Sequence, residues 1–190
     1  MTTTQYLALL RGINVGGSNI IKMTALKTCF EEMGFANVLT YIQSGNVIFD
    51  APKQDIAALT QKIERVLSKK FNYTSQIVLV SQKDLATVVK NAPPKFGADS
   101  ARYRYDVLFL KPPLTAREAL KVVSLKEGVD FVHAGKGVLY FSRLISKATQ
   151  SKLSKIVLLP IYKSITIRNW NTTTKLAALV DARSQSKNKG

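Results

Sequence analysis

Residues 9–17 read LLRGINVGG, an apolar run that breaks into a glycine-rich loop. The apolar run covers residues 6–10, and a short continuous stretch of this kind predicts a buried β-strand. The loop after it combines glycines, which permit many backbone conformations, with polar side chains, and this combination is typical of a binding loop. Its contributing residues are Arg11, Gly12, Asn14, Gly16 and Gly17.

A helix and a hairpin are predicted next. Apolar residues at helical spacing predict a helix that Thr24 caps and Gly34 ends, with Cys29 on its buried stripe. Residues 38–42 and 47–49 then predict two strands. The four residues between them, Gln43-Ser44-Gly45-Asn46, predict a polar hairpin turn in which Gly45 takes positive φ.

The first half ends with two helices around one strand. Residues 50–52 are expected to open a long helix, and residues 77–80 predict a strand. Ser81 followed by Asp84 resembles a capping box at the start of the next helix. Residues 95–100 then read as a linker.

The same order of elements follows a second time. Strands are predicted at residues 105–110, 130–133, 139–141 and 165–167. Three helices are predicted between and after these strands. The first begins with a capping box at Thr115, the second carries Leu153, Ile156 and Val157, and the third starts at Asn171 or Thr172. Local echoes support the repeat: Gly-x-x-x-Phe occurs at residues 45–49 and 137–141, and a tyrosine, Tyr6 or Tyr105, opens the first strand of each half.

This order predicts an α+β protein made of two ferredoxin-like (split βαβ) halves in tandem, with antiparallel sheets and helices packed on one face. The halves are expected at residues 1–95 and 96–190, the second with a basic C-terminal segment. In this topology the first two strands of a half run parallel and the third returns between them. The Arg11 loop and the 43–46 turn are therefore expected at the same end of one sheet.

Such a pair of loops suits the recognition of an anion. The glycines expose backbone N–H groups, and Arg11 offers a planar cationic fork for phosphate or carboxylate. The loop matches neither the Walker A motif nor the dinucleotide fingerprint. The alternative is that the glycines only turn the chain and that the asparagines cap turns. The candidate ligand-binding residues here are Arg11, Gly12, Asn14, Gly16, Gly17, Gln43, Ser44 and Asn46.

The stretch RNWNT at residues 168–172 is the second candidate. It contains the only tryptophan and joins a strand to the last helix, whose N-terminus is a natural anion site. The alternative is a capped helix with Trp170 packed as a core anchor. The candidate residues are Arg168, Asn169, Asn171 and Lys175.

The charge is the strongest bulk feature. The 190 residues carry a formal net charge of +16, and residues 147–190 hold nine Lys or Arg and one acid, Asp181. A basic surface attracts nucleic acid, nucleotides or other anions, although it also occurs simply as a solvated surface. The N-terminus carries no secretory signal, no apolar stretch is long enough to span a membrane, and a cytoplasmic location is expected.

No set of catalytic residues is recognisable. His133 is the only histidine and Cys29 the only cysteine, so a zinc site is not expected and no cofactor is implied. Asp106 and Asp130 have no spacing that would pair them as catalytic carboxylates. Whether the protein is an enzyme is left open by the sequence.

The motifs RGINVGG (residues 11–17) and TYIQSGNV (residues 40–47), with RNWNT and Lys175-Leu176 near the C-terminus, resemble a bacterial family known as a domain of unknown function, number sixteen ninety-seven. The resemblance covers nearly the whole chain and implies two ferredoxin-like halves. It implies no reaction, cofactor or substrate. The family's recurrent polar positions correspond to Arg11, Asn14, Gln43, Ser44, Asn46, Arg168, Asn169 and Asn171.

The leading functional hypothesis is a cytoplasmic protein that binds a phosphate-bearing ligand, either a nucleotide or a nucleic acid, through the Arg11 loop and the 43–46 turn. One alternative is a small-molecule enzyme that uses the same loops as a cleft. Another is an assembly protein whose basic surface meets an acidic partner. The oligomeric state is not predicted.

Overall fold

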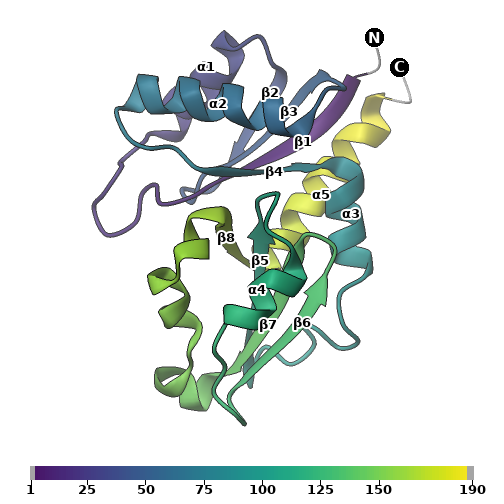
Figure 1. Ribbon diagram of the computed structural model, residues 1–190. Helices are drawn as coiled ribbons and strands as arrows, with labels where there is room; N and C mark the ends of the chain where they lie inside the picture. The colour runs from purple at the N-terminus through teal and green to yellow at the C-terminus, as the bar shows by residue number, and fades with distance from the viewer. Residues whose placement is uncertain (1–2, 188–190) are drawn as a thin grey trace. The chain divides into compact units, whose positions relative to one another are not determined.

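The chain forms two four-stranded antiparallel sheets, as the computed structural model describes for residues 3–187 (Figure 1). Residues 3–85 with 178–187 make up one compact unit, called the first unit, and residues 86–177 make up the second unit. These limits differ from the division expected at residue 95. Residues 86–95 associate with the second unit, and the end of the last helix associates with the first.

The first sheet contains β1 (Thr3–Leu10), β2 (Ala36–Tyr41), β3 (Asn46–Pro52) and β4 (Ile77–Ser81) in the order β2-β3-β1-β4. β3 is antiparallel to both β1 and β2, so β1 and β2 point the same way with β3 between them. This is the split βαβ arrangement that the order of elements predicts.

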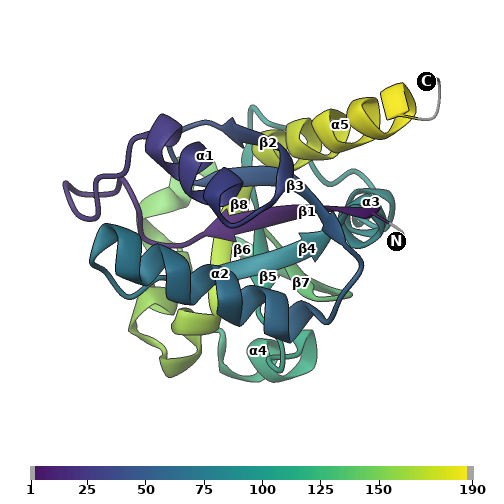
Figure 2. The ribbon, with the colours of Figure 1, turned by 90° about the horizontal axis from the view of Figure 1, so that it is seen from above.

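Two helices cover one face of this sheet, α1 (Met23–Glu32) and α2 (Ile56–Phe71) (Figure 2). Their apolar stripes bury Phe30 and Ile63 against Tyr6 and Phe49 of the sheet. The ring of Phe49 lies 5.3 Å from that of Phe30 and 5.7 Å from that of Tyr6, measured between centroids. Cys29 is fully buried in the same core, which confirms its place on the apolar stripe.

Two helix starts differ from expectation. α1 begins at Met23, so Thr24 lies inside the helix. The residue at the N-cap is Lys22, whose side chain has no oxygen to accept a capping hydrogen bond. β3 continues through Asp50 to Pro52 because these residues pair with Gln5, Thr4 and Thr3 of β1. The buried Asp50 carboxylate accepts hydrogen bonds from Gln5 (3.4 Å) and Asn37 (2.6 Å). The cap of α2 is therefore displaced to Asp55, whose Oδ1 accepts from the Ala58 amide at 2.8 Å.

The second sheet contains β5 (Tyr103–Leu110), β6 (Asp130–Gly135), β7 (Val138–Leu144) and β8 (Ile165–Asn169) in the order β6-β7-β5-β8. This order repeats that of the first sheet, which confirms the tandem architecture. On one face lies α4 (Ala116–Val122), which the predicted capping box of Thr115 and Glu118 opens.

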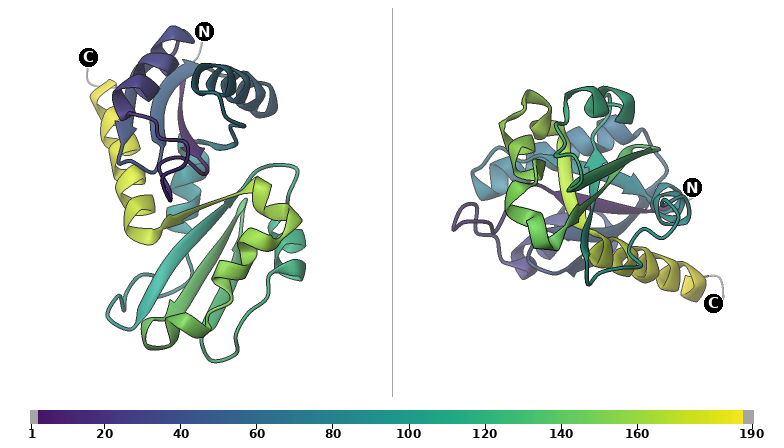
Figure 3. Two further views of the ribbon diagram at one scale, coloured as in Figure 1. Left: turned by 90° about the vertical axis from the view of Figure 1, so that its left-hand side faces the viewer. Right: turned by 90° about the horizontal axis from the view of Figure 1, so that it is seen from below.

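Three 3₁₀ turns replace the helix expected around residue 155, and they lie on the same face of the sheet as α4 (Figure 3). They are η1 (Ile145–Gln150), η2 (Leu153–Leu158) and η3 (Pro160–Ser164). In a 3₁₀ turn, residues three apart share a face. Leu153 and Ile156 are therefore buried together, whereas Val157 is 52% exposed.

In each unit an equivalent backbone hydrogen bond joins the end of the first strand to the hairpin turn between the second and third strands. The amide of Leu10 donates to the carbonyl of Gly45 at 2.8 Å, and the amide of Leu110 donates to the carbonyl of Gly137 at 2.9 Å. The two Gly-x-x-x-Phe echoes therefore occupy equivalent positions.

The tyrosine echo does not mark equivalent positions. Phe49 pairs with Tyr6, whereas the matching Phe141 pairs with Asp106. Tyr105 is thus one residue out of step with Tyr6, and its side chain lies on the opposite face of its sheet.

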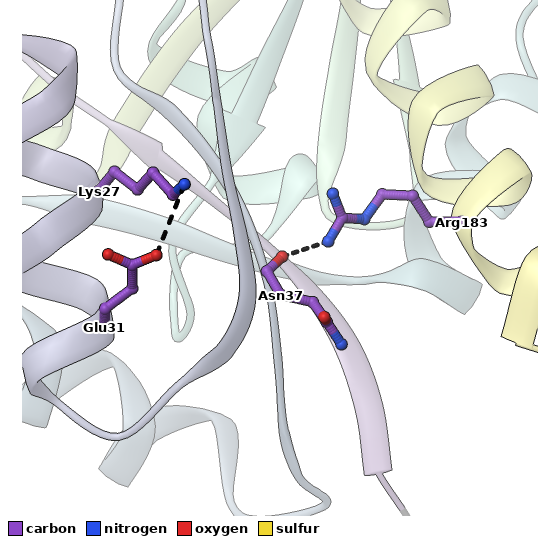
Figure 4. Close-up of polar contacts among 4 residues, drawn as sticks. All are labelled: Lys27, Glu31, Asn37 and Arg183. Atoms are coloured by element: carbon purple, nitrogen blue, oxygen red, sulfur yellow. Dashed lines mark hydrogen bonds and ion pairs between the residues drawn. The ribbon is translucent and has the colours of Figure 1, made fainter.

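Two further helices complete the chain, α3 (Gln82–Lys90) and α5 (Trp170–Lys187). Near the end of α5, the Arg183 guanidinium donates to the backbone carbonyl of Asn37 (Figure 4). This bond links the last turns of α5 to β2 within the first unit. The same figure shows the exposed ion pair of Lys27 and Glu31 on α1, at 3.6 Å. No helix within residues 3–187 has the length and apolar character needed to cross a membrane.

The two hairpin glycines provide a matched test of this packing. Gly45 (φ +77°) and Gly137 (φ +71°) both have left-handed backbones, but only at Gly45 would an added Cβ lie 2.8 Å from the Cβ of Leu10. We expect Gly45→Ala to lower the free energy of unfolding by about 1–3 kcal/mol more than Gly137→Ala, because the overpacking is added to a shared backbone strain. Urea denaturation of both variants measures the difference. Equal losses would show that the Leu10 contact is relaxed without cost.

Candidate functional site

The predicted binding loop leaves β1 at Arg11 and returns to the core at Ile21. Arg11 is half-buried, and Ile13 and Ile21 are anchored in the core at either end of the loop. Gly16 and Gly17 between them are exposed, with φ of +59° and +78°, and added Cβ atoms would meet nothing within 4 Å. The loop therefore presents open backbone to solvent between two buried anchors.

The predicted adjacency of this loop and the 43–46 turn is confirmed by two hydrogen bonds. The Leu10 amide reaches the Gly45 carbonyl, and the Asn14 Nδ2 donates to the Gln43 carbonyl at 2.8 Å. The split βαβ topology places these segments at one end of the sheet, where one backbone hydrogen bond and one side-chain hydrogen bond join them.

Asn14 is the main connector within the loop. Its Oδ1 accepts from the Ile21 amide at 2.8 Å, and its Nδ2 donates to the Ile21 carbonyl at 3.0 Å as well as to Gln43. Its backbone has φ +53°, a region that asparagine tolerates better than most residues. Asn19 adds a bond of 2.8 Å from its Nδ2 to the Gly12 carbonyl.

Asn46 has the corresponding role in the turn. Its side chain is fully buried and donates to the Tyr41 carbonyl at 2.8 Å and to the Ser44 hydroxyl at 3.1 Å. Gln43 by contrast is exposed, and Ser44 is half-buried. Within this first group of candidates, the asparagines hold the two segments together. Gln43 and the glycines at residues 12, 16 and 17 are exposed, and Arg11 is half-buried.

The second group of candidates lies in the second unit at the end of β8. Arg168 is only 8% exposed, and its Nη1 donates to the Ile167 carbonyl at 2.9 Å. Burial lowers the pKa of Arg168 to about 10, because removal from water penalises the charged guanidinium. Arg168 is thus part of the packed interior of the second unit.

Asn169 caps α5, because its Oδ1 accepts from the Thr172 amide at 2.7 Å. The helix accordingly begins at Trp170, and its cap lies two or three residues before the expected Asn171 or Thr172. Asn171 and Lys175 are exposed on the first turns of the helix.

Trp170 both packs and lines a hollow. Its ring lies 5.1 Å from that of Phe96, and an added Cβ at Gly97 would be 2.2 Å from its Cδ1. The hollow beside it measures about 240 Å³. It is lined by Gly97, Ser100, Tyr103, Arg104, Tyr105, Ile145, Asn169, Trp170 and Asn171.

A second hollow, of about 210 Å³, was not predicted from the sequence. It shares Tyr103 and Tyr105 with the first, and Phe131 and His133 of β6 lie on its other side. The available signal was the alternation of aromatic and other residues along these strands, since residues two apart share a face of a sheet. None of the residues that line this hollow is among the binding candidates predicted from the sequence.

The titratable groups do not assemble a catalytic set within residues 3–187. These residues contain no cluster of three or more His, Cys, Asp or Glu side chains able to hold a metal ion. Burial raises the pKa of the Cys29 thiol, which makes it a poor nucleophile. Burial also raises the pKa of Asp106, although Arg143, 3.9 Å away, partly offsets this.

The framework role of Asn14 is tested against that of Asn19. Both have left-handed backbones (φ +53° and +48°), so a change to glycine removes the side chain of either without adding strain. We expect Asn14→Gly to lower the free energy of unfolding by about 1–3 kcal/mol, because it leaves the amide and carbonyl of Ile21, both in part-buried hydrogen bonds, without their partner and also removes the bond to Gln43. Asn19→Gly should cost less, since it removes one bond to an exposed carbonyl. Thermal denaturation of both variants checks the order, and a reversed order would contradict the assignment.

Comparisons with known proteins agree with this architecture. No curated protein matches the chain significantly. The structure is similar to that of a conserved bacterial protein from Streptococcus pneumoniae, with a TM-score of 0.82 and 29% sequence identity over 94% of this chain and 99% of that one. The sequence profile of the family described as "Protein of unknown function (DUF1697)" matches residues 3–140. The chain therefore belongs to the DUF1697 family.

Proposed function

We propose that the Arg11 loop and the 43–46 turn bind the phosphate group of a small ligand of the nucleotide class. The observation that carries the proposal is the joining of the two segments by the Leu10–Gly45 and Asn14–Gln43 hydrogen bonds. They bring a cationic side chain, exposed glycine backbone and a polar turn to one end of the first sheet.

Each part of the loop has a distinct role in the proposal. Arg11 supplies a guanidinium fork, which matches phosphate oxygens in a bidentate manner. The amides of Gly12, Gly16 and Gly17 approach the anion closely because no side chain intervenes. Asn14 and Asn46 hold these groups in place rather than contact the ligand.

The charge of the chain supports the same chemistry. A net charge of +16 raises the local concentration of anions and speeds their association. Residues 168–175 belong to the second unit, and the proposal does not require them to reach the same ligand. Of these residues, Asn169, Trp170 and Asn171 line the separate hollow in the second unit.

The test is a thermal-shift screen of the wild type and Arg11→Ala against nucleotides, sugar phosphates and inorganic phosphate. A ligand at about 100 times its Kd adds about 2.7 kcal/mol to the free energy of unfolding. We expect a shift with the wild type that Arg11→Ala abolishes and Arg11→Lys reduces, because lysine keeps the charge without the fork.

Lys22→Ala provides the matched control, because Lys22 is an exposed cation at the end of the same loop. It should keep the wild-type shift. Equal loss in Lys22→Ala and Arg11→Ala would reduce the effect to general charge, and no shift with any phosphate compound would refute the proposal.

A further inference from the structure

Five aromatic rings form a continuous row in the second unit, on the face of the sheet opposite α4. Tyr105 of β5 and Phe131 of β6 both pair with Ser142 of β7, so the three residues share one face. Between centroids, Phe131 lies 6.0 Å from Tyr103, and Tyr103 lies 6.1 Å from Tyr105. Phe96 continues the row, 4.9 Å from Tyr105 and 5.1 Å from Trp170.

The row is open to solvent at its β6 end and hollowed on both sides. Phe131 is 42% exposed, which is unusual for a large apolar ring. The hollows of about 210 and 240 Å³ share Tyr103 and Tyr105 as a common wall. Each is smaller than the roughly 300–1,000 Å³ of a typical small-molecule site. A single planar ring system fits each hollow better than a complete cofactor does.

The electrostatics around the rings favour a polyanion. Residues 86–177 contain 16 Lys or Arg and 5 Asp or Glu, a net charge of +11. Lys95 and His133 line the smaller hollow, and the Arg102 guanidinium lies 5.5 Å from the Tyr103 ring centroid. Neither hollow has an acidic residue among the described residues that line it. The acid next to this region, Asp99, accepts a hydrogen bond from the Arg102 amide at 3.1 Å.

We propose that this face of the second unit binds single-stranded nucleic acid. Successive bases stack in the two hollows on either side of Tyr103 and Tyr105, while Lys95 and Arg102 meet the phosphates. Exposed aromatic rings on a four-stranded sheet, flanked by cations, are a general stacking platform for unpaired bases. Asn171, at the rim of the larger hollow, offers an amide to a base edge. The site uses no residue of the Arg11 loop and is independent of the proposed function.

A proline-rich peptide is the competing occupant, since aromatic grooves also bind polyproline helices. The observations favour nucleic acid because such a peptide has no need of the surrounding positive charge. Duplex nucleic acid is disfavoured because its bases are already stacked on each other and cannot enter the hollows.

The experiment measures fluorescence anisotropy of a labelled single strand of about ten nucleotides, within the range that such platforms cover. RNA and DNA strands, the matching DNA duplex and a labelled proline-rich peptide are compared. We expect Phe131→Ala and Tyr103→Ala each to weaken binding of the single strand by about 5- to 150-fold, the loss typical of one stacked base. Phe131→Tyr should retain affinity, because the ring is kept.

Two controls separate stacking from other effects. Leu158→Ala removes an apolar side chain that is 80% exposed in the same unit and lies outside both hollows, so it should bind like the wild type. Lys22→Ala, which removes an exposed cation of the first unit, should also retain affinity for the single strand. Melting curves establish that each variant is folded.

Three results would overturn the proposal. The first is no binding of any single strand by the folded wild type. The second is equal affinity for single strand and duplex, with Phe131→Ala and Tyr103→Ala unaffected, which would indicate charge alone. The third is binding of the proline-rich peptide in place of the oligonucleotides.

Discussion

The first strand of each unit ends against the turn of the neighbouring hairpin, and this constraint organises the rest of each sheet. In the first unit the turn glycine, Gly45, lies so close to Leu10 and Ile13 that an added Cβ would collide with both. Glycine meets two demands there, a left-handed backbone and close approach. The strand register, the direction of the loop from Arg11 and the position of the 43–46 turn all follow from this closure. The equivalent bond from Leu110 to Gly137 shows that the second unit is closed in the same way, with looser packing.

Most of the polar side chains of the loop and turn that form hydrogen bonds form them with other residues of these two segments. Asn14 and Asn46 use their amides on backbone groups of the loop and turn, because partly buried carbonyls and amides need partners. Gln43 and the glycines at residues 12, 16 and 17 are exposed to solvent, and Arg11 is half-buried. The loop therefore has an exposed tip between two ends that are fixed in the core.

The two faces of the second sheet carry different kinds of side chain. One face packs α4 and the 3₁₀ turns over an apolar core. The other carries the aromatic row, with Arg168 buried near its β8 end and Phe131 open at its β6 end. A buried guanidinium is costly, and the depressed pKa of Arg168 reflects that cost. Exposure along this face therefore increases from the buried Arg168 on β8 to the exposed ring of Phe131 on β6.

The architecture is predictable from the sequence, because the order of strands and helices, repeated twice, is compatible with few topologies. The adjacency of the Arg11 loop and the 43–46 turn is predictable as well, since it follows from strand direction alone. Tertiary structure decided where elements begin and end. β3 extends to Pro52 because residues 50–52 pair with β1, and the segment around Leu153 forms 3₁₀ turns in which Val157 is exposed. It also decided the aromatic row, because Phe96, Tyr103, Phe131 and Trp170 come from separate segments. Their meeting depends on strand register and on one helix start, and neither is readable from local pattern.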